Sequence, residues 1–99
     1  MLEITIGSDD VIALAGRFDA AQADRAQTFL DGVVKLRVID CARLEYVSSA
    51  GLGVLLRTHK RVLADGGGLE LINVNHHIAD IFRYSALDRV FRIQPAPQA

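Results

Sequence analysis

The sequence predicts a single α/β domain with a mainly parallel sheet of four to five strands, packed by about three helices. Three observations indicate this class. Short apolar runs alternate with stretches in which apolar residues recur every three or four positions, most connections are too long for hairpins, and no repeat or low-complexity tract interrupts the 99 residues. Such an alternation favours parallel strands joined by helical crossovers. Residues 1–99 are therefore expected to fold as one unit.

An N-terminal hairpin opens the predicted sheet. Residues 2–6 alternate apolar and polar side chains, and residues 11–15 form a second apolar run. The Gly-Ser-Asp-Asp segment at 7–10 between them has the residue types that turns favour. We therefore expect two neighbouring strands here, joined by a tight connection.

A first helix and a buried strand follow the hairpin. The apolar run of the second strand breaks at Gly16. Asp19, which follows this break, can cap a helix that ends near Gly32. One face of this helix carries apolar side chains at helical spacing, namely Ala26, Phe29, Leu30 and Val33. Residues 36–40 then have the composition of a buried strand that ends on Asp40.

The most informative stretch, residues 46–56, places two serines and two glycines where this strand gives way to an amphipathic helix. We expect that helix to span about residues 50–65. Its apolar face would carry Leu52, Leu55, Leu56, His59 and Leu63. A serine in this loop would be exposed, held by rigid elements and close to the free N–H groups of a helix start, where a phosphate is well accommodated.

The C-terminal third is expected to add a strand, a helix and a short last strand. Residues 66–68, three glycines, form a turn, and residues 69–74 form the next strand. Asn75 can cap a third helix, whose inward side chains include Ile78, Ile81 and Phe82. Residues 90–93 would form the last strand, and residues 94–99, with two prolines, a frayed tail.

Composition argues against several classes of function. With 11 Lys and Arg, 12 Asp and Glu and a formal net charge of -1, the chain lacks the basic excess typical of proteins that bind nucleic acids or anionic membranes. No apolar run is long enough to cross a bilayer, and no segment resembles a signal peptide. The single cysteine, Cys41, excludes an internal disulfide. We expect a cytoplasmic protein that binds neither nucleic acid nor membrane.

Metal, cofactor and catalytic sites are not expected either. His76 and His77 are neighbours on a predicted helix, so they point in different directions, and no cysteine or carboxylate stands at ligand spacing. The glycines at 66–68 lack the lysine and hydroxyl residue of a phosphate-binding loop. A nucleophile based on Ser49 is disfavoured because Val47 stands where a nucleophile elbow requires glycine.

Residues 38–40 and 47–56 together resemble the signature of STAS domains, in particular the stand-alone anti-sigma factor antagonists. The segment Leu-Ala-Gly-Arg-Phe-Asp at 14–19 is similar to the family's turn between the second strand and the first helix. The glycine run before residues 69–74, and Ile81-Phe82 followed by Leu87, match further landmarks. The resemblance extends over nearly all of the chain and implies the same α/β fold.

The resemblance implies a phosphorylation-switched binding protein rather than an enzyme. In such families an anti-sigma factor, or a related serine kinase of the histidine-kinase-like ATPase type, phosphorylates the loop serine, and phosphorylation abolishes binding. A serine phosphatase resets the protein. By motif position the acceptor is Ser49, two residues before Gly51. Ser48 stands where many members have an aspartate, and it remains the alternative acceptor.

A partner-binding surface around the serine loop is also implied. Its residues would be Asp19, Ser48, Ser49, Ala50, Gly51, Leu52, Gly53 and Arg57. Structural interpretations remain open beside the functional one. Asp19 also suits a helix cap, Arg57 a solvated charged face, and the two glycines a helix packed closely on a sheet. The alternative function is a phosphorylation-independent STAS interaction subunit of a transport or sensor complex.

Overall fold

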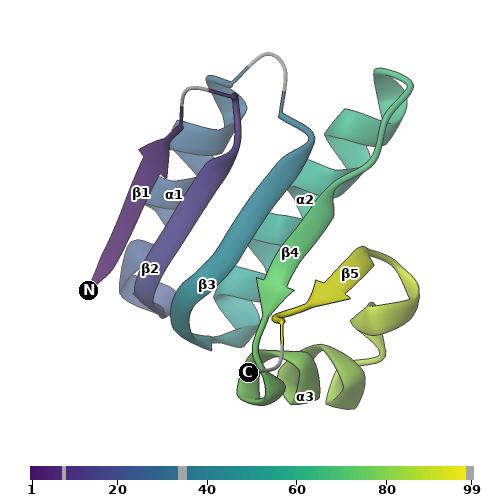
Figure 1. Ribbon diagram of the computed structural model, residues 1–99. Helices are drawn as coiled ribbons and strands as arrows, with labels where there is room; N and C mark the ends of the chain where they lie inside the picture. Colours follow the sequence, from purple (N-terminus) through teal and green to yellow (C-terminus); the bar gives the residue numbers. More distant parts are fainter. Residues whose placement is uncertain (8, 34–35, 98–99) are drawn as a thin grey trace.

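The fold is built on a single five-stranded sheet (Figure 1). The computed structural model describes residues 1–7, 9–33 and 36–97. The strands lie side by side in chain order: β1 (Leu2–Ile6), β2 (Ile12–Phe18), β3 (Val38–Val47), β4 (Glu70–Val74) and β5 (Arg92–Pro95). β1 runs antiparallel to β2, and every other neighbouring pair is parallel. The predicted hairpin and mainly parallel sheet are therefore confirmed.

Three α-helices complete the described fold: α1 (Ala23–Asp31), α2 (Ser49–Ala64) and α3 (His76–Tyr84). Short 3-10 turns, η1 (Ala20–Gln22) and η2 (Leu87–Arg89), precede α1 and follow α3. Asn75 caps α3 as predicted, because its Oδ1 accepts the N–H of Ile78 at 2.9 Å. α1 and α2 lie behind the sheet, whereas α3 lies beyond the carboxyl ends of β3 and β4 (Figure 1).

The core lies between the sheet and the helices behind it. Successive side chains of a strand point to opposite faces, so alternate residues of each strand turn inward. The largest buried side chains of β2, β3 and β4 are Ile12, Leu14, Phe18, Ile39, Leu44 and Leu71. The helices add Val54, Leu55 and Val62 from α2, with Ala26 and Leu30 from α1. The helical periodicity of the sequence therefore reflects a buried seam along α1 and α2, although Leu63, expected on the apolar face of α2, is 52% exposed.

Cys41 belongs to this core. Its side chain is fully buried on β3, and burial, together with the nearby Asp40 carboxylate, raises the pKa of the thiol to about 12. A thiol reacts as its thiolate, and this thiol stays protonated at neutral pH. Cys41 is therefore a packing residue rather than a redox site.

β3 is longer than the sequence predicted. The expected strand ended at Asp40, but the observed strand continues to Val47. Its alternation of buried and exposed residues breaks at Ala42, near a shift in the register between β2 and β3. The Oδ1 of Asp40 accepts the N–H of Ala42 at 2.9 Å, which satisfies the backbone at this irregularity. The irregularity hides the second half of the strand from a period-two pattern.

β2 passes through the point where a break was predicted. The strand continues through Gly16 to Phe18. Gly16 has a φ of +95°, and a Cβ on it would lie 2.2 Å from the carbonyl oxygen of Met1. Glycine tolerates both the positive φ and the close approach of another backbone. The residue that suggested a strand end thus allows β1 to lie against β2.

The last strand begins and ends later than predicted. β5 covers Arg92–Pro95 rather than residues 90–93. The first two residues of the expected frayed tail therefore belong to the sheet, and the N–H of Ala96 also donates to the carbonyl of Val74 at 3.0 Å. Pairing with β4 gives this segment the partner that a free tail would lack. Residues 98–99, the end of that tail, lie outside the described residues.

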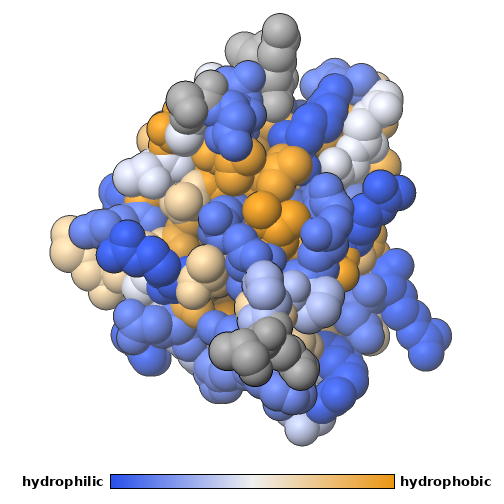
Figure 2. Space-filling view, viewed as in Figure 1, coloured by the Kyte–Doolittle hydropathy of each residue, from blue (hydrophilic) through white to orange (hydrophobic). Residues whose placement is uncertain are grey.

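The face of the sheet opposite α1 and α2 carries no helix in the described residues (Figure 1). Figure 2 shows this face from the same side, with apolar residues gathered over the middle of the sheet between polar ones. A shallow cavity of about 80 Å³ lies over β1, β2 and β3, and Thr5, Ala13 and Ala42 are among the residues that line it. The small alanine side chains leave the strand backbones near the surface.

β1 forms one edge of the sheet, since it pairs only with β2 in the described residues. Arg25 of α1 reaches this edge, where its Nη2 donates to the carbonyl of Leu2. The same nitrogen donates to Gln22 Oε1 at 2.9 Å. This one side chain therefore ties α1 to the first strand.

Candidate functional site

Ser48 joins β3 to α2 and is the N-cap of that helix. Its backbone is extended, with φ -80° and ψ 171°, and its Oγ accepts the N–H of Gly51 at 3.1 Å. The N–H of Ser48 donates to the carbonyl of Phe18 at 2.8 Å, and its carbonyl accepts the N–H of Leu52 at 2.9 Å. A capping hydroxyl satisfies one of the free N–H groups of a helix start. The Ser48 side chain is thus already engaged in building the turn.

Ser49 is the first residue of α2, and its side chain is exposed. Its hydroxyl makes no hydrogen bond to the described residues, in contrast to the bonded hydroxyl of Ser48. The positive end of the helix dipole and the first backbone N–H groups of α2 lie beside it. Of the two predicted acceptors, Ser49 is therefore the hydroxyl that a visiting protein can reach without dismantling the cap.

The two glycines of the motif have different surroundings. Gly51 is buried, and a Cβ on it would lie 2.9 Å from the carbonyl oxygen of Phe18 and 3.0 Å from the Phe18 ring. Gly53 is half-buried, and a Cβ on it would meet only the Nη1 of Arg57, at 3.4 Å. Gly51 lets α2 lie against the end of β2, whereas Gly53 keeps the surface beside Ser49 low.

The expected partner surface is thus divided between core and solvent. Leu52 belongs to the hydrophobic core and is only 9% exposed, and Gly51 is covered by β2. Ala50 is half-buried, and Arg57 is exposed. Ser49, Gly53 and Arg57 contribute to the outer surface of the motif, the other half-buried members border it, and only Gly51 and Leu52 support it from inside.

Asp19 lies beside the serine turn, because the residue before it, Phe18, accepts the N–H of Ser48. It precedes η1, but its side chain makes no capping hydrogen bond, and α1 begins only at Ala23. The prediction that its side chain caps this helix is therefore wrong. Its Oδ1 is buried without a hydrogen-bond partner among the described residues. A buried polar atom in this state is uncommon, so the carboxylate has unused capacity to accept a bond.

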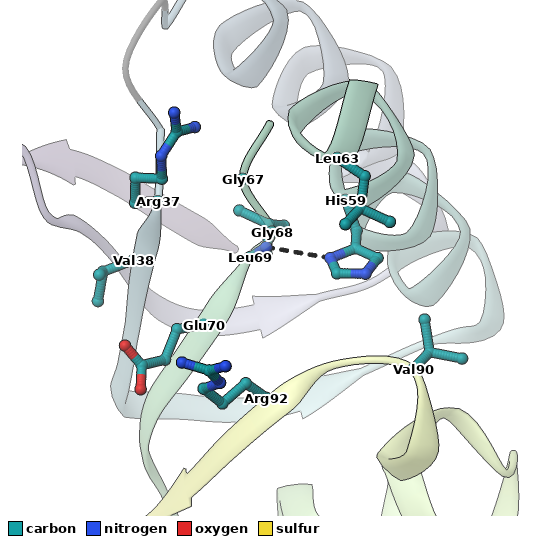
Figure 3. Close-up of a pocket in the computed structure, with 10 residues that line it drawn as sticks. All are labelled: Arg37, Val38, His59, Leu63, Gly67, Gly68, Leu69, Glu70, Val90 and Arg92. Carbon is teal, nitrogen blue, oxygen red and sulfur yellow. Dashed lines mark hydrogen bonds between the residues drawn. The ribbon is translucent and has the colours of Figure 1, made fainter. Parts of the chain in front are cut away.

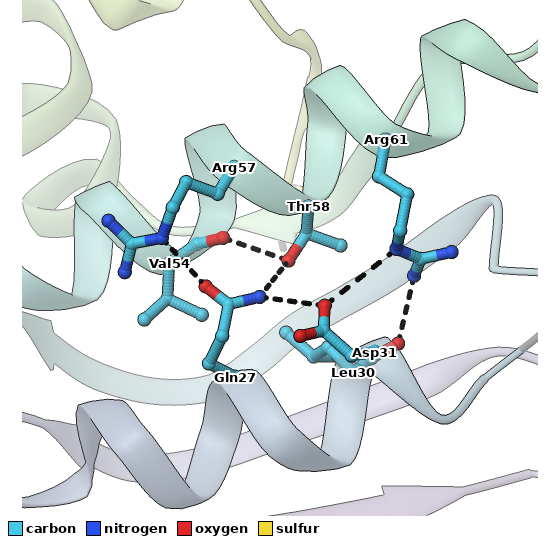
Figure 4. Close-up of polar contacts among 7 residues, drawn as sticks. All are labelled: Gln27, Leu30, Asp31, Val54, Arg57, Thr58 and Arg61. Carbon is cyan, nitrogen blue, oxygen red and sulfur yellow. Dashed lines mark hydrogen bonds and ion pairs between the residues drawn. The ribbon is translucent and has the colours of Figure 1, made fainter.

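Arg57 takes part in a polar network between α1 and α2 that the sequence did not reveal (Figure 4). Its Nε donates to Gln27 Oε1 at 3.0 Å. The Nε2 of Gln27 donates in turn to Thr58 Oγ1 at 3.3 Å and to Asp31 Oδ1 at 3.0 Å. Thr58 is fully buried, and its hydroxyl donates to the carbonyl of Val54 at 2.8 Å. The network fixes the inner part of the Arg57 side chain against α1.

A cavity of about 640 Å³ lies at the opposite end of α2 (Figure 3). His59 and Leu63, which line this cavity, follow Ser49 on α2 at distances of roughly 15 and 21 Å along the helix axis. The predicted glycine turn at 66–68 forms part of the wall, together with Arg37, Glu70 and Arg92. The cavity is therefore separate from the serine turn.

His59 closes the inner side of that cavity. Its Nδ1 accepts the N–H of Leu69 at 3.0 Å, and its ring packs against Phe91 with 4.9 Å between ring centroids. Burial lowers the pKa of the imidazole. The neutral ring is the form that the fold requires, because a protonated Nδ1 could not accept the Leu69 N–H.

We expect the free energy of unfolding to fall as the pH drops below about 6.5, the ordinary pKa of histidine. The unfolded chain then binds a proton that the folded His59 resists, until the pH also passes the lowered pKa of the folded state. Urea unfolding between pH 7.5 and 5 measures this loss. His59→Gln, whose amide oxygen can accept the same N–H, should flatten the profile, and the exposed His76→Gln should not. If the free energy of unfolding depends on pH equally in wild type and His59→Gln, His59 is not the source of this loss.

Ser48→Ala should lower the free energy of unfolding by about 1 kcal/mol, the usual cost of losing a hydroxyl N-cap. Ser49→Ala removes a hydroxyl with no bond in the described residues, so its effect should stay within about 0.5 kcal/mol. Urea unfolding of both variants at neutral pH gives the comparison. The reverse order of stabilities would show that the two hydroxyls have exchanged roles.

The site contains no metal centre in the described residues, where no group of three or more His, Cys, Asp or Glu side chains could hold an ion. Within the same part of the chain, no helix combines the length and apolar character required to span a bilayer. The serine turn lies at the end of the sheet, with the Ser49 side chain exposed to solvent.

This chain is similar to known proteins in sequence and to solved structures in fold. BtrV of Bordetella bronchiseptica, which carries the name of an anti-sigma factor antagonist, is 29% identical over 93 residues, covering 90% of this chain and 80% of BtrV. An anti-sigma factor antagonist from Mycobacterium paratuberculosis has a similar fold, with a TM-score of 0.79, 21% identity, and coverage of 96% of this chain and 85% of that one.

The Bacillus protein SpoIIAA, an anti-sigma factor antagonist, is similar in both its unphosphorylated and phosphorylated forms. The TM-scores are 0.76 and 0.70, at 17% identity, over 99% of this chain and 90% or 93% of SpoIIAA. The sequence profile of the family described as "Mlab, STAS domain" matches residues 5–95, from β1 to the last residue of β5. The chain therefore belongs to the STAS domain family.

Proposed function

We propose that this protein is an anti-sigma factor antagonist whose binding is switched by phosphorylation of Ser49. Its relationship to BtrV supports the class of function. The main observation in support of the switch is that the Ser49 hydroxyl is exposed, beside a serine that already caps the helix. The unphosphorylated form would bind an anti-sigma factor that is also a serine kinase of the histidine-kinase-like ATPase type. A serine phosphatase would restore this form.

A phosphate on Ser49 should leave the domain folded. Phosphoserine carries about -1.5 to -2 charges at neutral pH, and here it would stand at the positive end of α2. An anion at this end of a helix is stabilising by about 0.3 to 1 kcal/mol. The effect of the modification must therefore fall on the complex, where the partner would have to desolvate the new charge or face it with its own carboxylates.

A binding role suits the site better than catalysis. The Ser49 hydroxyl has no histidine or carboxylate bonded to it in the described residues, so no general base is in place to activate it. The outer surface of the motif is shallow because Gly53 has no side chain. A partner that contacts this flat surface would meet either a neutral hydroxyl or a charged phosphate, and its affinity would differ between the two. A cytoplasmic location, expected from the composition, fits this role.

Phosphorylation with the cognate kinase tests the proposal. The purified protein is incubated with ATP and the anti-sigma kinase, and intact mass and peptide mapping are then recorded. We expect the mass of one added phosphoryl group on Ser49, none in Ser49→Ala, and normal labelling in Ser48→Ala. Labelling of Ser48 would overturn the choice of acceptor. Stable binding without labelling would favour the phosphorylation-independent subunit, and ester hydrolysis lost in Ser49→Ala would indicate an enzyme.

A further inference from the structure

The guanidinium of Arg57 lies one helical turn closer to Ser49 than its own backbone does. Its Nη1 is 3.4 Å from the position that a Cβ on Gly53 would occupy. Side chains on a helix lean toward its N-terminus, and Arg57 follows this direction. In Figure 4 the terminal nitrogens extend past Val54, on the side of the guanidinium away from Thr58 and Arg61. The absence of a side chain at Gly53 provides the space that the guanidinium occupies.

The Arg57 guanidinium is fixed at one nitrogen and free at the others. Its Nε donates to the neutral Gln27 Oε1, and no carboxylate of the described residues lies within ion-pairing distance of it. Neither Nη group has a hydrogen-bond partner among those residues. Arg61 differs, because its Nη2 donates to the carbonyl of Leu30 at 2.9 Å and its Nε lies 3.8 Å from Asp31 Oδ1. Arg57 therefore offers oriented, unneutralised donors.

Ser49 and Gly53 are four residues apart on α2, so their Cβ positions lie about 5–6 Å from each other. A phosphoryl group extends beyond the serine Oγ and carries three acceptor oxygens, which gives it the reach to meet a guanidinium that itself leans toward the N-terminus of α2. Building on the phosphorylation of Ser49 proposed above, we propose that Arg57 is the internal receptor of the phosphate, with its Nη groups donating to the phosphoryl oxygens across Gly53. Arginine suits this role because its fork of N–H groups matches a phosphate.

The ion pair would change two properties of the outer surface of the motif together. The phosphate would be held along α2 over Gly53 rather than projecting into solvent, so it covers the lowest part of the outer surface. The guanidinium would also be paired with the phosphate, so its positive charge would no longer be available to acidic groups of a partner. One modification at Ser49 thus adds an anion and withdraws a cation. The transfer step itself, in which the Ser49 oxygen displaces ADP from the γ-phosphorus of ATP and releases its proton, belongs to the kinase.

The test uses protein with phosphoserine installed at position 49 during translation, so no kinase is required. Phosphorus NMR then follows the second ionisation of the phosphate from pH 4.5 to 8 in low salt. A nearby cation favours the dianion, so we expect the pKa of the phosphate in the wild type to be lower than in Arg57→Gln by about 0.5. Arg61→Gln is the matched control, since its guanidinium is engaged with α1, and it should retain the wild-type value. Circular dichroism confirms that each variant is folded.

The outcomes separate this inference from the proposed function. Equal phosphate pKa values in wild type and Arg57→Gln overturn the inference, even where a kinase labels Ser49. An equal rise in Arg61→Gln also overturns it, because the effect would then reflect the total charge of α2. A rise confined to Arg57→Gln, which diminishes in 1 M salt, supports it. Failure of every cognate kinase to label Ser49 would reject the proposed function while leaving the measured ion pair intact.

Discussion

Replacing Gly51 with alanine will lower the free energy of unfolding by about 1 to 3 kcal/mol, the usual cost of overpacking a core. The added Cβ would lie 2.9 Å from the carbonyl oxygen of Phe18 and 3.0 Å from its ring. Neither neighbour is free to move, because that carbonyl accepts the N–H of Ser48 and the ring is fully buried. α2 would have to withdraw from the end of β2. Urea unfolding followed by circular dichroism measures the loss.

Gly53→Ala is the matched control, two residues along the same helix. A Cβ there meets only the end of the flexible Arg57 side chain, at 3.4 Å. Alanine also favours a helix over glycine by up to about 1 kcal/mol. Gly53→Ala should therefore keep or raise the stability, and the two variants should differ in sign. A common loss of stability in both would show that the close approach of Phe18 is not what distinguishes Gly51.

Ser49→Asp should weaken binding to the cognate anti-sigma factor by at least about tenfold, or about 1.4 kcal/mol. The carboxylate places a charge on the exposed surface that the partner must desolvate on contact. The thermal midpoint should stay nearly unchanged, because an acid at the first position of α2 interacts favourably with the helix dipole. Calorimetric titration and thermal unfolding of the same preparation give both values.

Ser49→Ala is the companion variant. It should bind the anti-sigma factor in the presence of kinase and ATP, since no hydroxyl remains to be modified, and binding of the wild type should decline under the same conditions. A large drop in the thermal midpoint of Ser49→Asp would contradict the mechanism, because the loss of binding would then reflect unfolding. If the Ser49→Asp variant is folded and its affinity is unchanged, a charge at residue 49 does not affect binding.

The sequence was most informative where local chemistry decides the structure. The N-terminal hairpin, the cap of α3 by Asn75 and the serine turn depend on neighbours within a few residues, and each lies where the pattern predicted it. The cap role of Asp19 was wrong for a local reason as well, since η1 intervenes and α1 begins three residues after Ala20. A capping residue type does not specify which of two consecutive turns it begins.

The remaining features depend on contacts between distant parts of the chain. The second half of β3 has charged residues at positions such as Arg43 and Glu45, and its pairing with β2 decides that it is a strand. The bond between Arg57 and Gln27 joins residues 30 positions apart, on helices whose contact no local pattern reveals. The orientation of Arg57 over Gly53 is consequently a structural finding, although the sequence had placed both residues near the site.

The bond from Arg25 to the Leu2 carbonyl bears on how copies of this domain meet. An edge strand offers unpaired backbone groups that can recruit a strand from another chain and start aggregation. On β1 the guanidinium already occupies one acceptor that an incoming strand would use. Growth of the sheet through this edge would first require breaking this charge-assisted bond, so the arginine adds a cost to strand addition at β1.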